Sequence, residues 1–287
     1  MYSKKIIVTG ASGFIGRHLI KLFAEYPGID AIPLSRKSIP GYLTVPSYID
    51  PPDGEILIHL AEDNNTNGIG LTNRRYEKTV TDTINSFFNK KYEKIIYIST
   101  SMLYGDSSIN AHGTEDEIFT DTRYCELKYL AESCVLKSSS GFVARLSNVY
   151  GKGMSKSNVM SHILNQIQKG GDLEIQNSAP VRDFINVRDV VEGIFAISMS
   201  DFTNNPTNNV YNIGTGVGTS IGDLAKLMLE KSGQNERKIV SKGNNDMKST
   251  VVLDYSKMFQ DFRWKPQIPL VDGITNLFRI DPSEKNK

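Results

Sequence analysis

The sequence predicts an α/β fold in which a doubly wound parallel sheet carries helices on both faces and a smaller lobe follows towards the C-terminus. Short apolar runs, typical of buried strands, alternate with longer segments of helical apolar spacing up to residue 147. After 148–153 this pattern loosens, and no internal repeat or long linker separates independent halves. We therefore expect the lobe to lie over the carboxyl edge of the sheet.

Five apolar runs in the first half are short and rich in β-branched residues, which favours strands. They lie at 4–10, 30–36, 55–61, 93–100 and 141–147. Between them, apolar residues recur at helical spacing in the segments 13–26, 79–90 and 123–138. This order predicts crossover units, in which a helix joins two parallel strands across one face of the sheet.

The second half contains fewer strand signals. We expect helices at 159–170, 187–199 and 221–233, a strand at 173–176 and a polar, Asn-rich loop at 200–210. We divide the chain into a sheet domain of residues 1–150 and a second lobe formed mainly by residues 151–287. Segment 184–200 is expected to pack back on the first domain.

Composition and charge exclude several classes of protein. The chain has 33 basic and 32 acidic side chains and a net charge of +1, so no basic excess favours nucleic acid as a partner. No apolar run approaches the roughly 20 residues of a membrane-spanning helix. The start, MYSKKIIVTG, lacks the apolar region of a signal peptide. We therefore expect a soluble, cytoplasmic protein that does not bind membranes.

Cysteine and histidine usage points to neither disulfides nor a metal centre. Cys125 and Cys134 lie in one expected helix, where a rise of about 13 Å between them prevents a disulfide. These two thiols and the four histidines fit no metal-ligand spacing. We expect reduced thiols and no bound metal.

The segment VTGASGFIGRHL, residues 8–19, lies where the first strand becomes a helix. Gly10 permits a tight turn, Gly13 lets the backbone approach a phosphate, and Gly16 lets the helix pack closely on the sheet. The helix N-terminus offers free N–H groups to a pyrophosphate. This pattern predicts a Rossmann-type dinucleotide site, with contacts from Gly10, Ser12, Gly13, Phe14, Ile15 and Gly16.

The end of the second strand indicates which dinucleotide binds. A carboxylate at this position commonly holds the ribose 2′-OH of NAD, but this chain has Ser35, Arg36 and Lys37. A hydroxyl and a guanidinium can bind a 2′-phosphate, which a carboxylate would repel. We therefore favour NADP(H) over NAD(H), with Ser35 and Arg36 as cofactor contacts. The alternative is that Arg36 and Lys37 belong to a solvated loop.

Tyr124 and Lys128 lie four residues apart in the expected helix 123–138, so both side chains lie on one helical face. The pair could be solvated at the surface, or it could form an acid/base centre. Half-ionisation of a tyrosine near pH 7 requires roughly 4 kcal/mol, because its ordinary pKa is about 10. Lys128 and an oxidised nicotinamide would both favour the phenolate and lower the pKa of Tyr124.

These motifs, together with others in the same order, resemble the extended short-chain dehydrogenase/reductase family. Specifically, the chain is similar to the NAD(P)-dependent epimerase/dehydratase branch, which acts on nucleotide-linked sugars. The similarity spans nearly the whole chain. Its motifs are TGASGFIG (9–16), IHLAE (58–62), STSMLYG (99–105), YCELK (124–128), RLSNVYG (145–151), RDFINVRDV (182–190), NIGTG (212–216) and WKP (264–266).

The resemblance implies roles for the matching positions. Tyr124 would be the acid/base, Lys128 would bind the nicotinamide ribose, and Thr100 would hydrogen-bond the reacting oxygen. Thr100 is chosen over Ser99 and Ser101 because it lies four residues before a tyrosine, where the family places its Ser or Thr. The remaining implied contacts are Leu60 and Ala61 to the cofactor, and Thr100, Ser101, Asn148 and Arg182 to the nucleotide-sugar substrate. Relatives also commonly form homodimers.

Departures from the family pattern narrow the reaction. Sugar 4,6-dehydratases of this family follow the catalytic Thr with Asp-Glu, whereas this chain has Ser101 and Met102, which cannot act as carboxyl acids. We therefore expect an NADP(H)-dependent reductase of a nucleotide-diphosphate-linked keto-deoxysugar, acting at carbon 4. One alternative is a nucleotide-sugar 4-epimerase that retains its NAD(P). An alternative of another class is a catalytically silent NADP(H) sensor.

Overall fold

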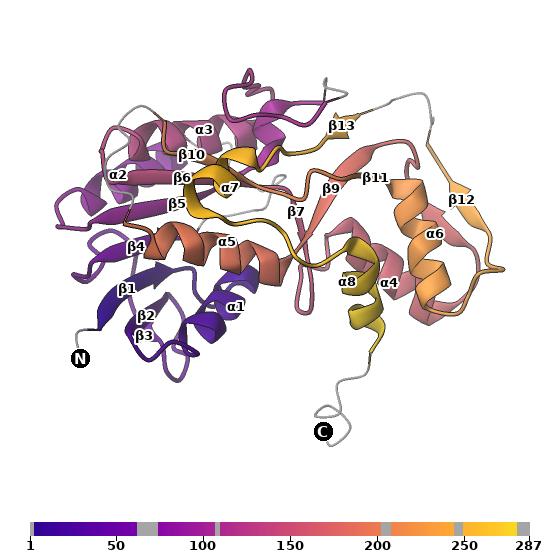
Figure 1. Cartoon of the computed structure of the whole chain (residues 1–287), viewed down its shortest axis with the longest axis horizontal. Helices are drawn as coiled ribbons and strands as arrows, with labels where there is room; N and C mark the ends of the chain where they lie inside the picture. The colour runs from indigo at the N-terminus through magenta and orange to yellow at the C-terminus, as the bar shows by residue number, and fades with distance from the viewer. Residues whose placement is uncertain (1–2, 62–73, 107–109, 202–207, 244–248, 280–287) are drawn as a thin grey trace.

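The computed structural model describes residues 3–61, 74–106, 110–201, 208–243 and 249–279, and it forms a sheet domain with a smaller lobe at one end (Figure 1). The main sheet has seven strands in the order β10-β6-β5-β4-β1-β2-β3, and every pairing is parallel. Its strands are β1 (Lys4–Thr9), β2 (Ile29–Ser35), β3 (Leu43–Thr44), β4 (Ile56–His59), β5 (Lys94–Thr100), β6 (Gly141–Leu146) and β10 (Val210–Ile213). The five strands predicted from apolar runs are confirmed, and the edge strands β3 and β10 are additions.

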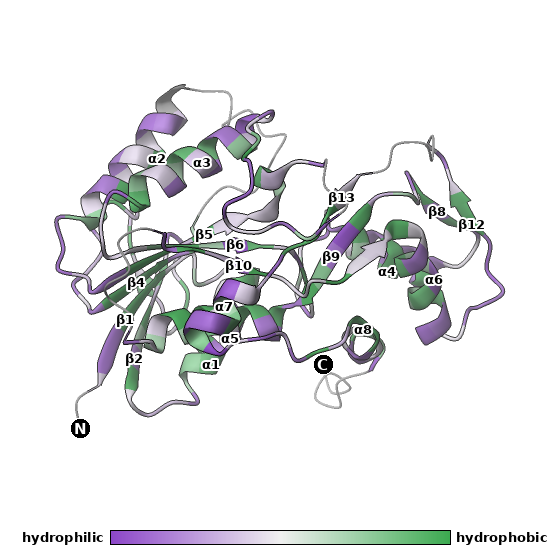
Figure 2. Cartoon of the chain, turned by 45° about the horizontal axis from the view of Figure 1, so that its top comes forward, coloured by the Kyte–Doolittle hydropathy of each residue, from purple (hydrophilic) through white to green (hydrophobic). Residues whose placement is uncertain are grey.

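Helices cover both faces of this sheet, as the doubly wound prediction requires. One face packs against α1 (Phe14–Phe23), α5 (Val187–Met199) and α7 (Ser256–Phe262), and the other against α2 (Arg74–Phe87) and α3 (Arg123–Val135) (Figure 2). The strands are buried on both sides, so their apolar side chains alternate between two cores. In β1, Ile6 and Val8 join the core under α1 and α5, whereas Ile7 joins the core under α2.

The smaller lobe has its own sheet and core. Its strands are β7 (Asn148–Tyr150), β9 (Val181–Asn186), β11 (Gly218–Ser220) and β13 (Thr250–Val251), with β8 (Leu173–Ile175) and β12 (Ile239–Ser241) in a separate pair. Helices α4 (Val159–Lys169), α6 (Ile221–Lys231) and α8 (Leu270–Phe278) enclose apolar side chains that include Ile163 and Leu224. Because β7 starts just after β6 ends, the lobe lies at the carboxyl edge of the main sheet.

The expected boundary between the two domains at residue 150 stays a prediction. Helix α5, from segment 184–200, packs on the main sheet beside α1. Two elements from later in the chain join it: β10 is an edge strand of this sheet, and α7 packs on the same face as α5. Within the described ranges, no helix is long and apolar enough to cross a membrane. Cys125 and Cys134 are both buried free thiols.

A buried ion pair fixes α3 to the main sheet. Arg145 in β6 donates two hydrogen bonds to Glu132 in α3, from Nε to Oε1 at 3.0 Å and from Nη2 to Oε2 at 2.7 Å. Arg145 also donates to the Tyr104 hydroxyl at 3.0 Å. Burial alone would lower the pKa of Arg145, but the hydrogen bonds and the charge of Glu132 raise it above its ordinary value. The pair therefore satisfies two charges that water does not reach.

We expect Glu132→Ala to lower the free energy of unfolding by about 3–5 kcal/mol, because it leaves the Arg145 guanidinium buried without its partner. The matched control is Glu126→Ala on the same helix, whose exposed pair with Arg123 should be worth at most about 1 kcal/mol. Urea unfolding followed by circular dichroism measures both. An equal loss of unfolding free energy in the two variants would show that the buried pair is worth no more than the exposed one, which contradicts this prediction.

Candidate active site

A cleft of about 810 Å³ opens at the carboxyl edge of the main sheet. Its walls come from the ends of β1, β4, β5 and β6 and from the facing sides of α2 and α3. In parallel sheets this edge, where the strand order reverses, is the usual ligand site. The sequence-predicted residues that line it are Gly10, Ser12, Gly13, Phe14, Ile15, Gly16, Arg36, Leu60, Ala61, Thr100, Tyr124 and Lys128.

The glycine turn between β1 and α1 has no room for side chains at two of its positions. Gly10 has a φ of +64°, and a Cβ there would lie 2.8 Å from the backbone of Leu60 and Ala61. A Cβ on Gly16 would lie 2.6 Å from Ala11. These close approaches bring the turn against the end of β4 and bring α1 against the turn.

The first turn of α1 is available for an anion. Its N-cap residue, Gly13, makes no side-chain cap, and the first turn contains no acidic residue. The amide N–H groups at a helix N-terminus have no intrahelical acceptor, and the helix dipole places partial positive charge there. Because this end lines the cleft, the turn can hold a pyrophosphate through backbone N–H groups.

Lys128 and Tyr124 are brought together on the opposite wall by α3. The Lys128 ammonium donates to the carbonyl oxygen of Ile98 at 2.9 Å and lies 5.0 Å from the centre of the Tyr97 ring and 5.8 Å from that of Tyr124. Lys128 is only 5% exposed, whereas Tyr124 is half-buried and lines the cleft. The alternative of a solvated surface pair is therefore wrong for Lys128.

Thr100 lies at the end of β5, where it caps the short 3-10 helix η2 (Ser101–Tyr104). Its Oγ1 accepts a hydrogen bond from the Met102 amide at 3.2 Å, and the residue lines the same cleft as Tyr124. Ser101 is buried and does not line the cleft, and Met102 is exposed. The structure thus brings Thr100, but not Ser101, to the same cavity as the tyrosine.

Of the two residues expected at the 2′-phosphate, Arg36 lines the cleft and Ser35 does not. Arg36 lines the cleft, with its guanidinium carbon 5.8 Å from the centre of the Tyr48 ring. Ser35 is buried outside the lining, and its Oγ accepts the N–H of Lys37 at 3.0 Å. The cationic part of the expected contact therefore lies at the cleft, whereas the Ser35 hydroxyl supports the turn.

Asn148 in β7 and Arg182 in β9, expected at the substrate diphosphate, are not among the residues that line the cleft. The Arg182 guanidinium donates to Asp106 at 3.3 Å and to the Ser249 hydroxyl at 2.6 Å. Burial lowers the pKa of Arg182, and Asp106 opposes that change. Their contact with substrate stays a prediction.

Three further polar residues line the cleft floor. Sequence reasoning missed Ser147, considered Ser99 only as a less favoured substitute for Thr100, and interpreted His59 as a packed strand residue. His59 shares a 2.7 Å hydrogen bond with Thr9 through Nδ1, and it lines the cleft. Ser99 and Ser147 also line it, and each has a buried hydroxyl oxygen that has no hydrogen-bond partner in the described structure. Their position directly at the carboxyl ends of strands 93–100 and 141–147 is a signal that could have identified them.

The charge of the cleft suits an anionic dinucleotide. Among the described residues of its lining, the permanently charged side chains are Arg36 and Lys128, and none is a carboxylate. Arg36 follows β2 and Lys128 lies in α3, and the uncapped end of α1 lines the same cleft. Cleft volume, glycine turn and charge therefore fit an NAD(P) cofactor extended along the edge of the sheet.

Comparison with curated proteins finds relatives that act on nucleotide sugars. The dTDP-D-glucose 4,6-dehydratase of Mus musculus is 24% identical, over 95% of this chain and 87% of its own length. CDP-abequose synthase of Salmonella typhimurium is 24% identical, over 96% and 97% respectively. GDP-6-deoxy-D-talose 4-dehydrogenase of Aggregatibacter actinomycetemcomitans is 27% identical, over 79% and 80%.

Solved structures share the fold over almost the whole chain. RMD from Pseudomonas aeruginosa, complexed with NADPH, has a TM-score of 0.80 at 22% identity, over 95% of this chain and 97% of that one. UDP-glucose 4-epimerase from Thermotoga maritima, with UDP-glucose, has a TM-score of 0.80 at 24% identity, over 94% and 96%. The model of the NAD dependent epimerase/dehydratase family matches residues 6–214. The chain therefore belongs to this family of NAD(P)-dependent enzymes that modify nucleotide-linked sugars.

Proposed function

We propose that this protein is an NADP(H)-dependent reductase that converts a nucleotide-diphosphate-linked keto-deoxysugar to the corresponding alcohol at carbon 4. The observation that carries the proposal is the shared cleft: Thr100, Tyr124 and Lys128 line the same cavity as the glycine turn. The relative named GDP-6-deoxy-D-talose 4-dehydrogenase acts, by its name, at carbon 4 of a nucleotide-linked deoxysugar, and the reverse of such a reaction is a ketone reduction.

We assign a separate role in that reduction to each of three side chains of the cleft. Bound NADPH supplies the hydride. Tyr124 donates its hydroxyl proton to the oxygen that becomes the alcohol, and the Thr100 hydroxyl stabilises the negative charge growing on that oxygen. The Lys128 ammonium lies 5.8 Å from the centre of the Tyr124 ring, so a positive charge is close to the oxygen that gives up the proton.

The residues after Thr100 argue against dehydration. A 4,6-dehydratase needs further proton transfers from carboxyl groups at this place, but Ser101 is a buried hydroxyl and Met102 an exposed thioether. Tyr124 is then the acid/base of the described cleft, which is sufficient for hydride transfer coupled to one proton transfer. We propose reduction rather than dehydration on this ground.

The preference for NADP(H) rests on Arg36. Its guanidinium lines the cleft, and the described lining contains no carboxylate to repel a 2′-phosphate or to bind a ribose 2′-OH. The expected homodimer and cytoplasmic location remain proposals alongside this one.

A 4-epimerase is the second candidate, because UDP-glucose 4-epimerase from Thermotoga maritima shares the fold. Such an enzyme oxidises and re-reduces one carbon with retained cofactor, using the same Tyr and Lys. The silent sensor is less well supported, since Tyr124 and Lys128 are both present and lie at the cleft.

Incubation of the protein with NADPH and a panel of nucleotide-linked 4-keto sugars should consume one NADPH per alcohol formed, measured by absorbance at the nicotinamide band and by mass spectrometry. Parallel incubations with nucleotide-linked hexoses test for epimerisation. Isomerised hexose without net NADPH oxidation would establish the epimerase instead. NADPH binding without turnover of any sugar in either panel would favour the sensor.

Tyr124→Phe should lower kcat at least about 100-fold while leaving the Kd for NADPH within about two-fold, because it removes the transferred proton and little binding area. Tyr129→Phe is the matched control on the same helix, since Tyr129 is exposed and lies outside the cleft lining. Its kcat should equal that of the unaltered protein. Retention of more than a tenth of the activity in Tyr124→Phe would remove this residue from the mechanism.

Arg36→Ala should raise the Kd for NADPH about ten-fold or more and leave the Kd for NADH nearly unchanged, because a charge-assisted hydrogen bond to phosphate contributes about 1.5–3 kcal/mol. Lys37→Ala removes an adjacent exposed cation that does not line the cleft. Fluorescence titration of the four protein–cofactor pairs measures the change in preference. An equal loss of affinity for NADH would argue against a 2′-phosphate contact at Arg36. So would an equal rise of the Kd for NADPH in Lys37→Ala.

A further inference from the structure

Two serines of the cleft floor combine burial with an unsatisfied hydroxyl. Ser99 is 5% exposed and Ser147 is 7% exposed, and neither Oγ has a hydrogen-bond partner in the described structure. A buried hydroxyl without a partner costs folding free energy and is uncommon in native proteins. Because both residues line the cleft, a bound ligand can supply the missing partner.

The sheet places both hydroxyls on the same side. Ser99 in β5 is paired in register with Arg145 in β6, and paired residues of neighbouring strands point to the same face. Ser147 lies two residues beyond Arg145, so its side chain also points to that face. This face is covered by α3, where Lys128 donates to the carbonyl of Ile98. The two serines therefore lie beneath the part of the cleft that holds Tyr124 and Lys128.

The strand order indicates which part of a dinucleotide lies there. The pyrophosphate belongs at the turn after β1, and Arg36, after β2, marks the adenosine side. The nicotinamide half must then extend the other way, over β4, β5 and β6. Within the main sheet, β6 is the farthest strand in this direction whose described residues line the cleft, and Ser147 directly follows it. We therefore expect Ser147 to lie at the nicotinamide end of the cofactor.

We propose that the Ser99 and Ser147 hydroxyls bind the carboxamide of the nicotinamide ring. A carboxamide is neutral and offers both N–H donors and a carbonyl acceptor, and a serine hydroxyl can donate and accept. Holding this group fixes the rotation of the ring about its bond to the ribose. It thereby determines which ring face is directed at the substrate. The proposal rests on the NAD(P) cofactor of the family and is independent of whether the reaction is reduction or epimerisation.

Three ligands separate the carboxamide from the rest of the cofactor. The 3-acetylpyridine analogue of NADP⁺ replaces the amide NH₂ by a methyl group, and 2′-phospho-ADP-ribose lacks the nicotinamide altogether. Calorimetry of the unaltered protein, of Ser147→Ala and of Ser99→Ala/Ser147→Ala with NADP⁺ and these two ligands gives nine Kd values. Ser198→Ala is the control, because Ser198 is also buried but its hydroxyl donates within α5 to the Ile194 carbonyl oxygen at 2.8 Å.

We expect each serine to contribute a factor of about 2–10 to the binding of NADP⁺. The unaltered protein should prefer NADP⁺ to the acetyl analogue about ten-fold, and the double variant should bind the two nearly equally. The affinity for 2′-phospho-ADP-ribose should not change in any variant. Ser198→Ala should leave all three affinities unchanged.

Thermal unfolding of the cofactor-free protein provides a second readout that does not depend on binding. Removing a hydroxyl that has no partner should leave the Tm of Ser147→Ala unchanged or higher, whereas Ser198→Ala should lower it. A lower Tm for Ser147→Ala would show that its hydroxyl is satisfied within the protein, which overturns the proposal.

Three other outcomes of the titrations would contradict the proposal. An equal weakening of NADP⁺ and 2′-phospho-ADP-ribose would assign the serines to the ribose, and an unchanged preference in the double variant would exclude the carboxamide contact. Failure of the unaltered protein to bind 2′-phospho-ADP-ribose and NADP⁺ would instead remove the cofactor assignment on which the proposal rests.

Discussion

Helix α3 carries two buried charges one turn apart, and each is bound to a different strand of the main sheet. Lys128 donates to the Ile98 carbonyl in β5, and Glu132 accepts two hydrogen bonds from Arg145 in β6. Residues four apart share one helical face, so both anchors act along the buried side of α3. Tyr124, one turn before Lys128, is thereby held at the cleft. A rotation or shift of α3 would break both anchors together.

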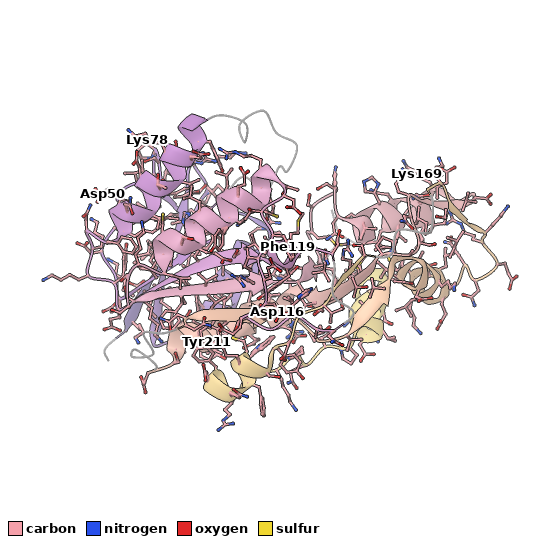
Figure 3. All side chains as sticks on the ribbon, turned by 90° about the horizontal axis from the view of Figure 1, so that it is seen from above. Asp50, Lys78, Asp116, Phe119, Lys169 and Tyr211 are labelled. Atoms are coloured by element: carbon pink, nitrogen blue, oxygen red, sulfur yellow. The ribbon has the colours of Figure 1, made fainter. Side chains whose placement is uncertain are left out.

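These anchors specify position more than they add stability. Buried ion pairs are often no more stabilising than apolar residues of similar volume, because desolvation offsets their attraction. Here they join α3 to a network of buried polar side chains. Arg145 also donates to Tyr104, whose hydroxyl donates to Asn212 at 2.7 Å and whose ring stacks on His112 at 4.9 Å. His112 pairs with Asp116, which lies near the middle of the molecule, between the α2 and α3 layer and the lobe (Figure 3).

Local patterns predicted the fold well because parallel strands and crossover helices have strong local signatures. Helix 187–199 was bounded correctly, and the glycine turn was found with its strand and helix. Contacts between distant segments could not be predicted in this way. The Arg182–Asp106 pair joins residues 76 positions apart, and no local pattern encodes it. Nor could sequence distinguish Ser35, which is buried in its turn, from Arg36, which lines the cleft.

The distribution of polar groups along the cleft follows the chemistry of the ligand that we propose. Positive charge is placed where an NADP(H) molecule is anionic: Arg36 on the adenosine side, and the uncapped end of α1 at the pyrophosphate. At the opposite end, the nicotinamide ring needs orientation rather than charge neutralisation, and the hydroxyls of Ser99 and Ser147 are neutral. Lys128 is the charged exception there, and its ammonium is held on a backbone carbonyl. A site that only stored the cofactor would not need a buried cation beside a tyrosine, because burying that charge is costly. A buried cation at this place is what the proton transfer that we propose for Tyr124 requires.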